Sequence, residues 1–341
     1  MTTVETMKAA VVTALDAPWE VKAVPRPRPG PAQVLIRVRA SGLCYTDVHL
    51  SQGGLLPLEL PAVLGHEPVG EIVEIGSAVR TRKVGDRVGT SALQAGCGRC
   101  EWCSRGDIID CADQKLLMIH RFGGHAEYLV AEEAATMLLP DGLSFEQAAP
   151  IFCAGNTVWS GLRAAEPLPG ARVAVVGIGG LGHLALQYAK AAGFRAIAIT
   201  RSKDKHALSR ELGADEVVED GEALARIGGA DVILSTANSY RTASDALRGL
   251  RPRGSLVVMG AAGPEEDLVI PNRTVFPQMM VNRQKILFSQ QNGREFVHEA
   301  VQLAASGKIR VLTETYSLDD ARKAYDRVSA GAVRFRAVLV P

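Results

Sequence analysis

A glycine-rich turn between an apolar segment and a helical segment constrains the fold of the second half of the chain. Residues Arg172–Val176 form a short apolar run typical of a buried strand. They lead into Gly177-Ile-Gly179-Gly180-Leu181-Gly182, and the pattern of His183–Ala192 is helical. Glycines let the backbone turn tightly and approach a pyrophosphate, and the helix N-terminus adds a partial positive charge. The segment predicts a dinucleotide-binding turn, with Gly177, Gly179, Gly180, Leu181 and Gly182 as contacts; a flexible glycine loop without a ligand is the alternative.

The same alternation of strand and helix continues along the chain. Arg195–Ile199, Ala230–Leu234 and Gly254–Val258 are further apolar runs, and Asp204–Leu212 has a helical pattern that Gly213 ends. Strands that alternate with helices of this length form a parallel sheet covered by helices on both faces. We therefore expect an α/β fold that includes a doubly wound Rossmann domain.

The first third of the chain has a different pattern, which indicates a β-rich domain. Val34–Arg39 alternates apolar and polar residues, and Gly70–Ile75 leads into a turn. Prolines at 25, 27, 29 and 31 make a stiff extended connection. After residue 287 the chain indicates one helix, Phe296–Ala305, and then short strands that end at Ala337–Val340.

Composition and charge exclude several classes of function. The chain has 341 residues, and 38 Lys and Arg residues balance 37 Asp and Glu residues to a formal charge of +1. That balance gives no reason to expect nucleic acid or an anionic membrane as a partner. Apolar runs are shorter than the about 18–20 residues of a membrane span, and the N-terminus lacks the pattern of a secretory signal. We expect a cytoplasmic protein, where clustered cysteines usually bind metal.

Four of the six cysteines, Cys97, Cys100, Cys103 and Cys111, lie within one short segment. Gaps of two residues let successive thiolates converge on one ion. Four sulfurs suit tetrahedral Zn²⁺ and leave no position for water, so the expected zinc is structural. Two disulfides or an iron–sulfur cluster are the alternatives.

The remaining cysteines are Cys44 and Cys153, and His66 follows Gly65 in a short Gly-His-Glu sequence. Together they could supply the three ligands of a catalytic zinc with an open fourth position, where an alcohol can bind and lose its proton. Taken singly, each is weak evidence, because a lone buried cysteine usually acts as a small hydrophobe and a lone histidine is usually structural.

Several motifs in a fixed order resemble those of one enzyme family. Cys44-x-Thr46-Asp47-x-His49, Gly65-His66-Glu67, the four-cysteine segment and the glycine turn are similar to the zinc alcohol dehydrogenases of the medium-chain dehydrogenase/reductase superfamily, over roughly residues 7–340. The resemblance implies a discontinuous GroES-like catalytic domain at 1–152 and 288–341 and a Rossmann domain at 153–287. It also implies a homodimer or homotetramer joined through the nucleotide domain.

The resemblance assigns roles around one catalytic and one structural zinc in each subunit. Cys44, His66 and Cys153 resemble the catalytic zinc ligands, and Glu67 resembles a nearby carboxylate that can transiently ligate. Asp47 is placed to hold the ligand imidazole in one tautomer.

The resemblance also implies a path for the substrate proton. Thr46 resembles the hydroxyl that takes this proton, and His49 the far end of a relay that runs through the cofactor ribose to solvent. A threonine can pass a proton without storing it, whereas a histidine titrates near neutral pH.

The end of the second Rossmann strand bears on the choice of cofactor. NAD-specific members place an acid there for the ribose diol, but here Thr200, Arg201, Ser202 and Lys203 follow Ile199. We favour NADP(H), with these four residues around the 2′-phosphate; use of NAD(H), with both cations merely solvated, is the alternative. By resemblance, Thr157, Arg294 and Arg336 are further cofactor-binding residues, whereas Phe288 stands where a glycine is common.

The expected substrates are medium-chain or aromatic primary alcohols and their aldehydes. Ala92 and Leu93 precede the four-cysteine segment, where ethanol-preferring relatives often have a large aromatic residue, and Trp159 could add an apolar wall or pack in the core. The alternatives are a reductase of the same superfamily acting on ketones or other substrates, or a non-catalytic zinc-binding relative. The remaining histidines match no ligand spacing and are expected to be structural or exposed: His120, His125, His183, His206 and His298.

Overall fold

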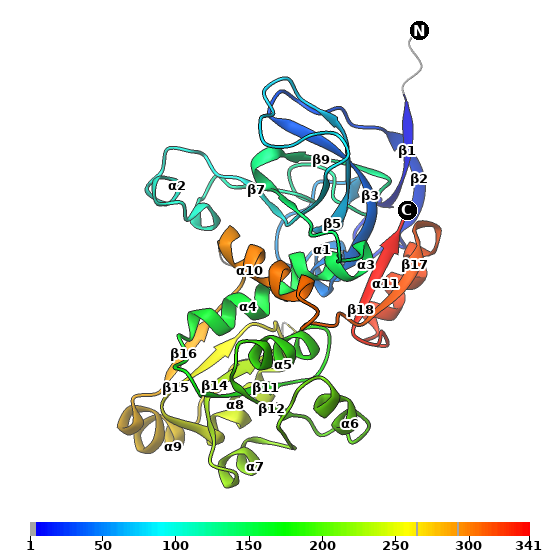
Figure 1. Ribbon diagram of the computed structural model, residues 1–341. Coiled ribbons are helices and arrows are strands. Elements are labelled where there is room, and N and C mark those ends of the chain that lie inside the picture. Colours follow the sequence, from blue (N-terminus) through cyan, green and yellow to red (C-terminus); the bar gives the residue numbers. More distant parts are fainter. Residues whose placement is uncertain (1–4, 264, 292) are drawn as a thin grey trace. The chain divides into compact units, whose positions relative to one another are not determined.

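The computed structural model describes residues 5–263, 265–291 and 293–341, which form two compact units (Figure 1). Unit 1 combines the chain up to Cys153 with Val311–Pro341, and unit 2 is Ala154–Arg310. The sequence predicts residues 288–310 in the catalytic domain, whereas here they belong to unit 2. The reason is helix α10 (Arg294–Ala305), which packs on α4 (Ala154–Ala164) inside unit 2.

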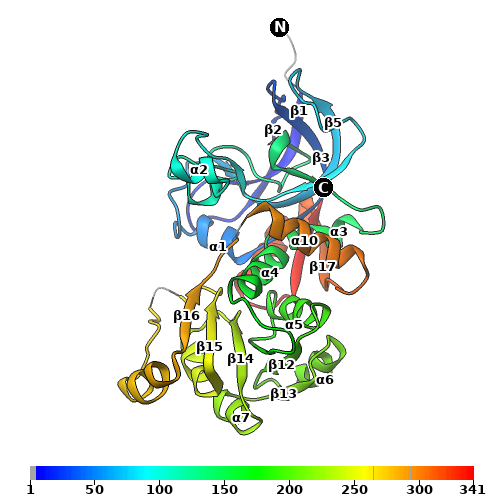
Figure 2. The same cartoon turned by 60° about the vertical axis from the view of Figure 1, so that its left-hand side comes forward.

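Unit 2 contains one parallel sheet with the strand order β13-β12-β11-β14-β15-β16 (Figure 2). This is the doubly wound order in which the chain reverses direction across the sheet between β11 and β14. The strands are β11 (Arg172–Val176), β12 (Arg195–Ile199), β13 (Glu216–Val218), β14 (Ala230–Ser235), β15 (Leu250–Val258) and β16 (Lys285–Phe288).

Helices cover both faces of this sheet. Ala174 and Val176 of β11 point into a core that includes Ala243 and Ala246 of α8, whereas α5 packs on the opposite side with α4 and α10. The helices of unit 2 are α4, α5 (Gly182–Ala191), α6 (Asp204–Glu211), α7 (Gly221–Arg226), α8 (Tyr240–Ala246), η4 (Leu247–Gly249), α9 (Asn272–Thr274), the π-helix η5 (Val275–Met280) and α10.

The predicted glycine turn lies at the carboxyl end of β11. Gly177 has a φ of +84°, which favours glycine, and a Cβ on Gly182 would collide with the carbonyl of Gly177. The hydroxyl of Thr236, just after β14, donates to the carbonyls of Val176 at 2.9 Å and Gly177 at 2.7 Å. The turn is thus held at the point where the strand order reverses, where doubly wound folds bind ligands.

Unit 1 is β-rich, and its largest sheet has the order β10-β6-β5-β3-β18-β17, with β9 paired to β3. Two smaller sheets have the orders β2-β1-β4 and β7-β8. The strands are β1 (Thr6–Val12), β2 (Glu20–Pro25), β3 (Gln33–Leu43), β4 (Ala62–Val63), β5 (Glu67–Ile75), β6 (Arg87–Thr90), β7 (Leu93–Ala95), β8 (Lys115–Leu116), β9 (Tyr128–Glu132), β10 (Thr136–Leu138), β17 (Thr313–Ser317) and β18 (Arg336–Val340).

Short helices connect these strands. They are α1 (Tyr45–Ser51), α2 (Glu101–Arg105), η1 (Ile108–Asp110), η2 (Glu133–Ala135), α3 (Phe145–Ala148), η3 (Ala149–Phe152), η6 (Leu318–Asp320) and α11 (Ala321–Ser329). Strand β18 brings the C-terminal segment into the same sheet as β3, which explains why unit 1 is discontinuous. Among the described residues, no helix is both long enough and apolar enough to cross a bilayer.

Candidate metal centres

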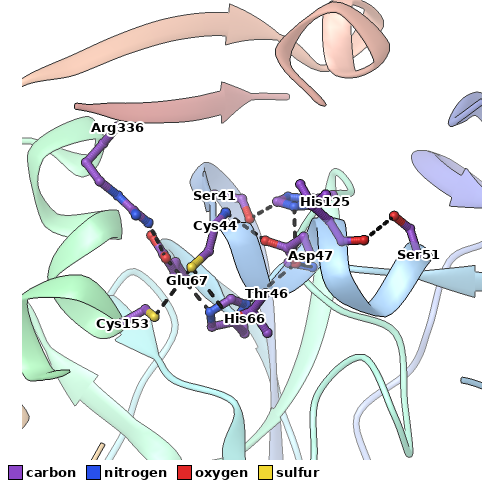
Figure 3. Close-up of polar contacts among 12 residues, drawn as sticks. Ser41, Cys44, Thr46, Asp47, Ser51, His66, Glu67, His125, Cys153 and Arg336 are labelled. Carbon is purple, nitrogen blue, oxygen red and sulfur yellow. Dashed lines mark hydrogen bonds and ion pairs between the residues drawn. The ribbon is translucent and has the colours of Figure 1, made fainter. Parts of the chain in front are cut away.

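Unit 1 gathers Cys44, His66, Glu67 and Cys153 at the ends of several elements (Figure 3). Cys44 lies between β3 and α1, His66 and Glu67 lie where β4 gives way to β5, and Cys153 directly follows η3. One ligand atom from each residue lies within 4.8 Å of the others, and all four residues are buried. Elements far apart in the sequence therefore bring two sulfurs, an imidazole and a carboxylate to one point.

The spacing of the two sulfurs fits a shared zinc ion. Cys44 Sγ lies 3.9 Å from Cys153 Sγ, much farther than the about 2.05 Å of a disulfide. Two sulfurs on one tetrahedral zinc, each at about 2.3 Å, stand about 3.8 Å apart. The pKa of Cys44 lies well below its usual range. The sulfur of Cys153 and the imidazole of His66 lower it by more than burial raises it. The donor set suits a soft divalent cation such as Zn²⁺.

Asp47 orients the imidazole of His66. Its Oδ2 accepts from the Cys44 N–H at 2.8 Å, and its Oδ1 accepts from the Gly65 N–H at 3.0 Å. The same Oδ1 lies 3.5 Å from His66 Nδ1. The other ring nitrogen, His66 Nε2, lies 3.9 Å from Glu67 Oε1. Burial opposes charge on Asp47, but the imidazoles of His66 and His125 outweigh it and lower the pKa of the carboxyl. Asp47 is thus an anion that leaves His66 Nε2 available for a metal.

Glu67 forms a buried ion pair with Arg336, the first residue of β18. The two strands flank β3, where Gly42 stands opposite both Glu67 and Val338. A Cβ on Gly42 would overlap the Glu67 carboxylate, so this glycine provides the space for the carboxylate. The sequence predicts Arg336 as a cofactor-binding residue and gives no signal for this contact or for Gly42.

The residues of the predicted proton path lie on α1. Thr46 Oγ1 is 3.7 Å from Cys44 Sγ, and the Thr46 side chain is half-buried. The ring of His49 meets the exposed ring of Tyr45 edge-on, with centroids 4.8 Å apart. Helix α1 therefore carries one hydroxyl beside the ligand set and one half-exposed imidazole.

The second cysteine group occupies α2, η1 and their flanking turns. Cys97, Cys100, Cys103 and Cys111 also bring their sulfurs within 4.8 Å of one another, and all six cysteines of the chain are free thiols in this structure. The sulfurs of Cys97 and Cys103 are 4.0 Å apart. This geometry contradicts the disulfide alternative and agrees with a tetrahedral metal site.

Backbone N–H groups point at these sulfurs, as expected for thiolates. Cys111 Sγ accepts from the Cys97 N–H at 3.3 Å, and Cys97 Sγ from the Cys100 N–H at 3.4 Å. Backbone N–H groups of Arg99 and Cys100 lower the pKa of Cys97 to about 6. At Cys103 the backbone acts in the same direction, but burial and the neighbouring sulfurs raise its pKa to about 11. Crowded thiolates repel one another, and a cation at their centre relieves the repulsion.

The predicted cofactor residues of unit 2 lie at several elements. The turn 177–182 joins β11 to α5, Thr157 is buried in α4, and Arg294 begins α10. Thr200–Lys203 connect β12 to α6, and Arg201, Ser202 and Lys203 are exposed. Trp159 donates its N–H to Glu299 at 2.6 Å and packs against Tyr188, so it is part of the core of unit 2.

Comparison with known proteins gives consistent matches over nearly the whole chain. Residues 30–141 match the family described as "Alcohol dehydrogenase GroES-like domain", and residues 180–306 match "Zinc-binding dehydrogenase". An alcohol dehydrogenase of Geobacillus stearothermophilus is 39% identical over 340 residues, which cover 98% of this chain and 99% of that protein. The chain belongs to the zinc-containing alcohol dehydrogenase family of the medium-chain dehydrogenase/reductase superfamily.

Solved structures of the family agree with this assignment. A NAD-dependent alcohol dehydrogenase has 30% identity and a TM-score of 0.89, covering 98% of this chain and 100% of its own. A zinc-binding dehydrogenase from Sinorhizobium meliloti, bound to NADP, has 29% identity and a TM-score of 0.87, covering 99% and 100%. The GroES-like and Rossmann folds predicted from the sequence are confirmed. The protein is a nicotinamide-dependent zinc alcohol dehydrogenase with two candidate zinc sites.

Proposed function

We propose that this enzyme interconverts medium-chain or aromatic primary alcohols and their aldehydes, with NADP(H) as its preferred cofactor. The observation that carries the proposal is the buried set of Cys44, His66 and Cys153, with the hydroxyl of Thr46 beside it. Those three side chains would hold the catalytic zinc, with Glu67 close enough to join them. Cys97, Cys100, Cys103 and Cys111 would hold a structural zinc.

Zinc, the nicotinamide ring and the side chains of the protein would contribute differently to the reaction. When bound, zinc supplies Lewis-acid polarisation of an oxygen, and the nicotinamide ring accepts or donates the hydride. The chain orients the ligands, because Asp47 holds His66 in one tautomer and Arg336 balances the charge of Glu67. Burial of all four residues excludes bulk water from this side of the centre.

Proton transfer is assigned to α1. Thr46 Oγ1 would take the hydroxyl proton of the alcohol and pass its own proton on, since a threonine does not store charge. His49 is the acceptor at the half-exposed end of the path, and contact with the ring of Tyr45 limits the orientations of its imidazole. In aldehyde reduction the same groups deliver the proton in the opposite direction.

The preference for NADP(H) rests on the connection between β12 and α6. Thr200, Arg201, Ser202 and Lys203 supply two hydroxyls and two cations after the end of β12, and no acid stands among them. Arginine is well suited to phosphate, because its guanidinium can donate two parallel hydrogen bonds. The turn at Gly177–Gly182, with Thr157 and Arg294 of the same unit, would bind the rest of the cofactor, and Arg336 of unit 1 is proposed as a further cofactor contact in addition to its ion pair with Glu67.

The substrate class rests on small and aliphatic side chains at the start of the four-cysteine segment. Ala92 and Leu93 are half-buried and leave more space than an aromatic residue would. Comparison of kcat/KM for ethanol, hexanol and benzyl alcohol tests this proposal. We expect hexanol and benzyl alcohol to exceed ethanol, and a higher value for ethanol would contradict the proposed substrate class.

A homodimer or homotetramer joined through unit 2 is also proposed. Strand β16 is an edge of the parallel sheet, and several large apolar side chains on or near it are exposed: Val269, Phe276, Met280, Val281 and Phe288. An exposed apolar patch beside an unpaired strand edge is typical of a surface covered in an assembly. Light scattering should report at least twice the chain mass of 36.3 kDa, and a monomer would contradict the assembly.

A further inference from the structure

A second histidine lies against the segment that carries the ligand His66. The N–H of His125 donates to the carbonyl of Leu64 at 2.9 Å, and the N–H of Gly124 to that of Gly65 at 2.7 Å. Gly65 has a φ of +101°, and a Cβ there would lie 2.7 Å from both the backbone N and the Nδ1 of His125. This glycine therefore lets the His125 ring lie directly on the turn before His66.

The imidazole of His125 joins Ser41 to Asp47 (Figure 3). Its Nδ1 is 2.9 Å from Ser41 Oγ, and its Nε2 is 3.8 Å from Asp47 Oδ1. The same Oδ1 faces His66 Nδ1 at 3.5 Å. Ser41, Asp47 and His125 each have an exposed fraction of 0%. Two imidazoles thus converge on one buried carboxylate oxygen.

The hydrogen-bond chemistry selects one tautomer of neutral His125. At 3.8 Å the contact of Nε2 with Asp47 Oδ1 is electrostatic, and an ionised carboxylate attracts an N–H and repels a nitrogen lone pair, so the nitrogen that faces Asp47 is the one that carries the proton. Nδ1 is then unprotonated and accepts from the Ser41 hydroxyl. The Ser41 hydroxyl, by donating to Nδ1, then stabilises the tautomer whose Nε2–H is directed at Asp47.

Serine, histidine and aspartate in this order also form the catalytic triad of hydrolases. That function does not fit here, because a nucleophile must meet its substrate and Ser41 is fully buried. The arrangement instead suits an internal support for the carboxylate.

We propose that His125 is a positioning residue for the proposed catalytic zinc centre. Its Nε2–H, set by Ser41, holds the Asp47 carboxylate so that Oδ1 faces His66 Nδ1 and His66 Nε2 stays directed at the metal. The backbone hydrogen bonds from His125 to Leu64 and from Gly124 to Gly65 hold His125 next to the turn that carries His66. The proposal rests on the proposed function, because it requires zinc on Cys44, His66 and Cys153.

Substitutions that replace one nitrogen of His125 but not the other test the proposal. The amide nitrogen of glutamine can take the place of Nε2, whereas asparagine reaches only the position of Nδ1, and phenylalanine replaces neither. The readout is the rate at which folded protein transfers zinc to a chromogenic chelator, with Cys44→Ser identifying the contribution of the structural site. We expect His125→Asn and His125→Phe to release the catalytic zinc about tenfold faster than the wild type, and His125→Gln to stay within about twofold.

Controls separate positioning from packing. Trp19→Phe alters the packing beside His125, whose ring centroid is 5.5 Å from that of Trp19, and should lower Tm without faster release. Ser41→Ala deletes one small hydroxyl and with it the hydrogen bond that stabilises one tautomer of His125. This variant should release zinc faster even if His125→Phe does not fold. Wild-type release from both His125→Asn and Ser41→Ala, or equal acceleration in His125→Gln and His125→Asn, would overturn the proposal. Equal zinc content in the wild type and Cys44→Ser would instead refute the proposed metal centre.

Discussion

Glu67 and Arg336 form a buried ion pair beside Cys44, His66 and Cys153, although 269 positions separate the two residues in the sequence. The pairing of β5 and β18 with opposite edges of β3 brings them together, and Gly42 between them has no side chain to block the contact. Burial alone would lower the pKa of the Arg336 guanidinium, but Glu67 and the sulfurs of Cys44 and Cys153 raise it. The pair thus sets the charge next to the metal centre.

Removal of one partner of this pair should destabilise unit 1. Arg336→Met leaves the Glu67 carboxylate without its counter-charge in a site that water does not reach. We expect the free energy of unfolding to fall by about 3–5 kcal/mol, as measured by denaturant titration.

The matched control removes both charges. Glu67→Gln in the Arg336→Met background should recover much of the loss, because no uncompensated charge then stays buried. An additive effect of the two substitutions would show that the two side chains do not stabilise each other.

The hydroxyl of Thr46 is expected to carry the substrate proton. Thr46→Ala should lower kcat by about a hundredfold or more, the range for loss of a proton-transfer group, while zinc content and Tm stay unchanged. Thr46→Ser keeps a hydroxyl and should keep most of the activity. Steady-state kinetics with one alcohol checks this, and similar kcat values for the alanine and serine variants would remove Thr46 from the mechanism.

Metal binding at the four-cysteine site should stabilise the fold of the segment that carries it. Cys100→Ser should lose the structural zinc and destabilise the segment between Cys97 and Cys111, because metal binding supplies folding free energy there. Limited proteolysis should then cut this segment much faster than in the wild type. Ser104→Ala, which removes only an exposed hydroxyl of α2 that donates to the Cys100 carbonyl at 3.0 Å and leaves every sulfur in place, is the matched control and should change the cleavage rate little. Full zinc content in Cys100→Ser would contradict a role for that sulfur.

Arg201 and Lys203 should determine the cofactor preference. The double variant Arg201→Ala/Lys203→Ala should lower kcat/KM for NADP by about tenfold or more and leave the value for NAD nearly unchanged, since each lost charged hydrogen bond costs about 1.5–3 kcal/mol. Lys205→Ala, two positions beyond the connection in the first turn of α6, controls for a general loss of positive charge. At least tenfold preference of the wild type for NAD would contradict the assignment.

Local patterns in the sequence predicted the Rossmann strands well. Arg172–Val176 and Arg195–Ile199 are strands over the predicted ranges, since a short apolar run next to a glycine turn is a strong local signal. Strand β15 begins earlier than predicted, at Leu250, because Leu250 pairs with Ala230 of β14 ahead of a register shift that passes over residues 251–254. Tertiary pairing of that kind leaves little trace in a local pattern.

The candidate site was predictable only where residue type and spacing restrict the chemistry. Six cysteines and one Gly-His-Glu sequence suffice to propose two metal sites. The supporting contacts of Gly42, Ser41 and His125 depend on which strands become neighbours. A glycine that makes room for a carboxylate, or a histidine that faces an aspartate from another segment, resembles any other glycine or histidine in the sequence.

Turnover by Cys44→Ser, measured on protein whose zinc has been counted, tests whether Cys44, His66 and Cys153 form the catalytic centre. We expect about two zinc ions in each wild-type chain and about one in the variant, whose fold persists because the four-cysteine site is intact. Alcohol oxidation by the variant should then be undetectable. Wild-type turnover in Cys44→Ser would contradict the assignment of Cys44, His66 and Cys153 as the catalytic centre.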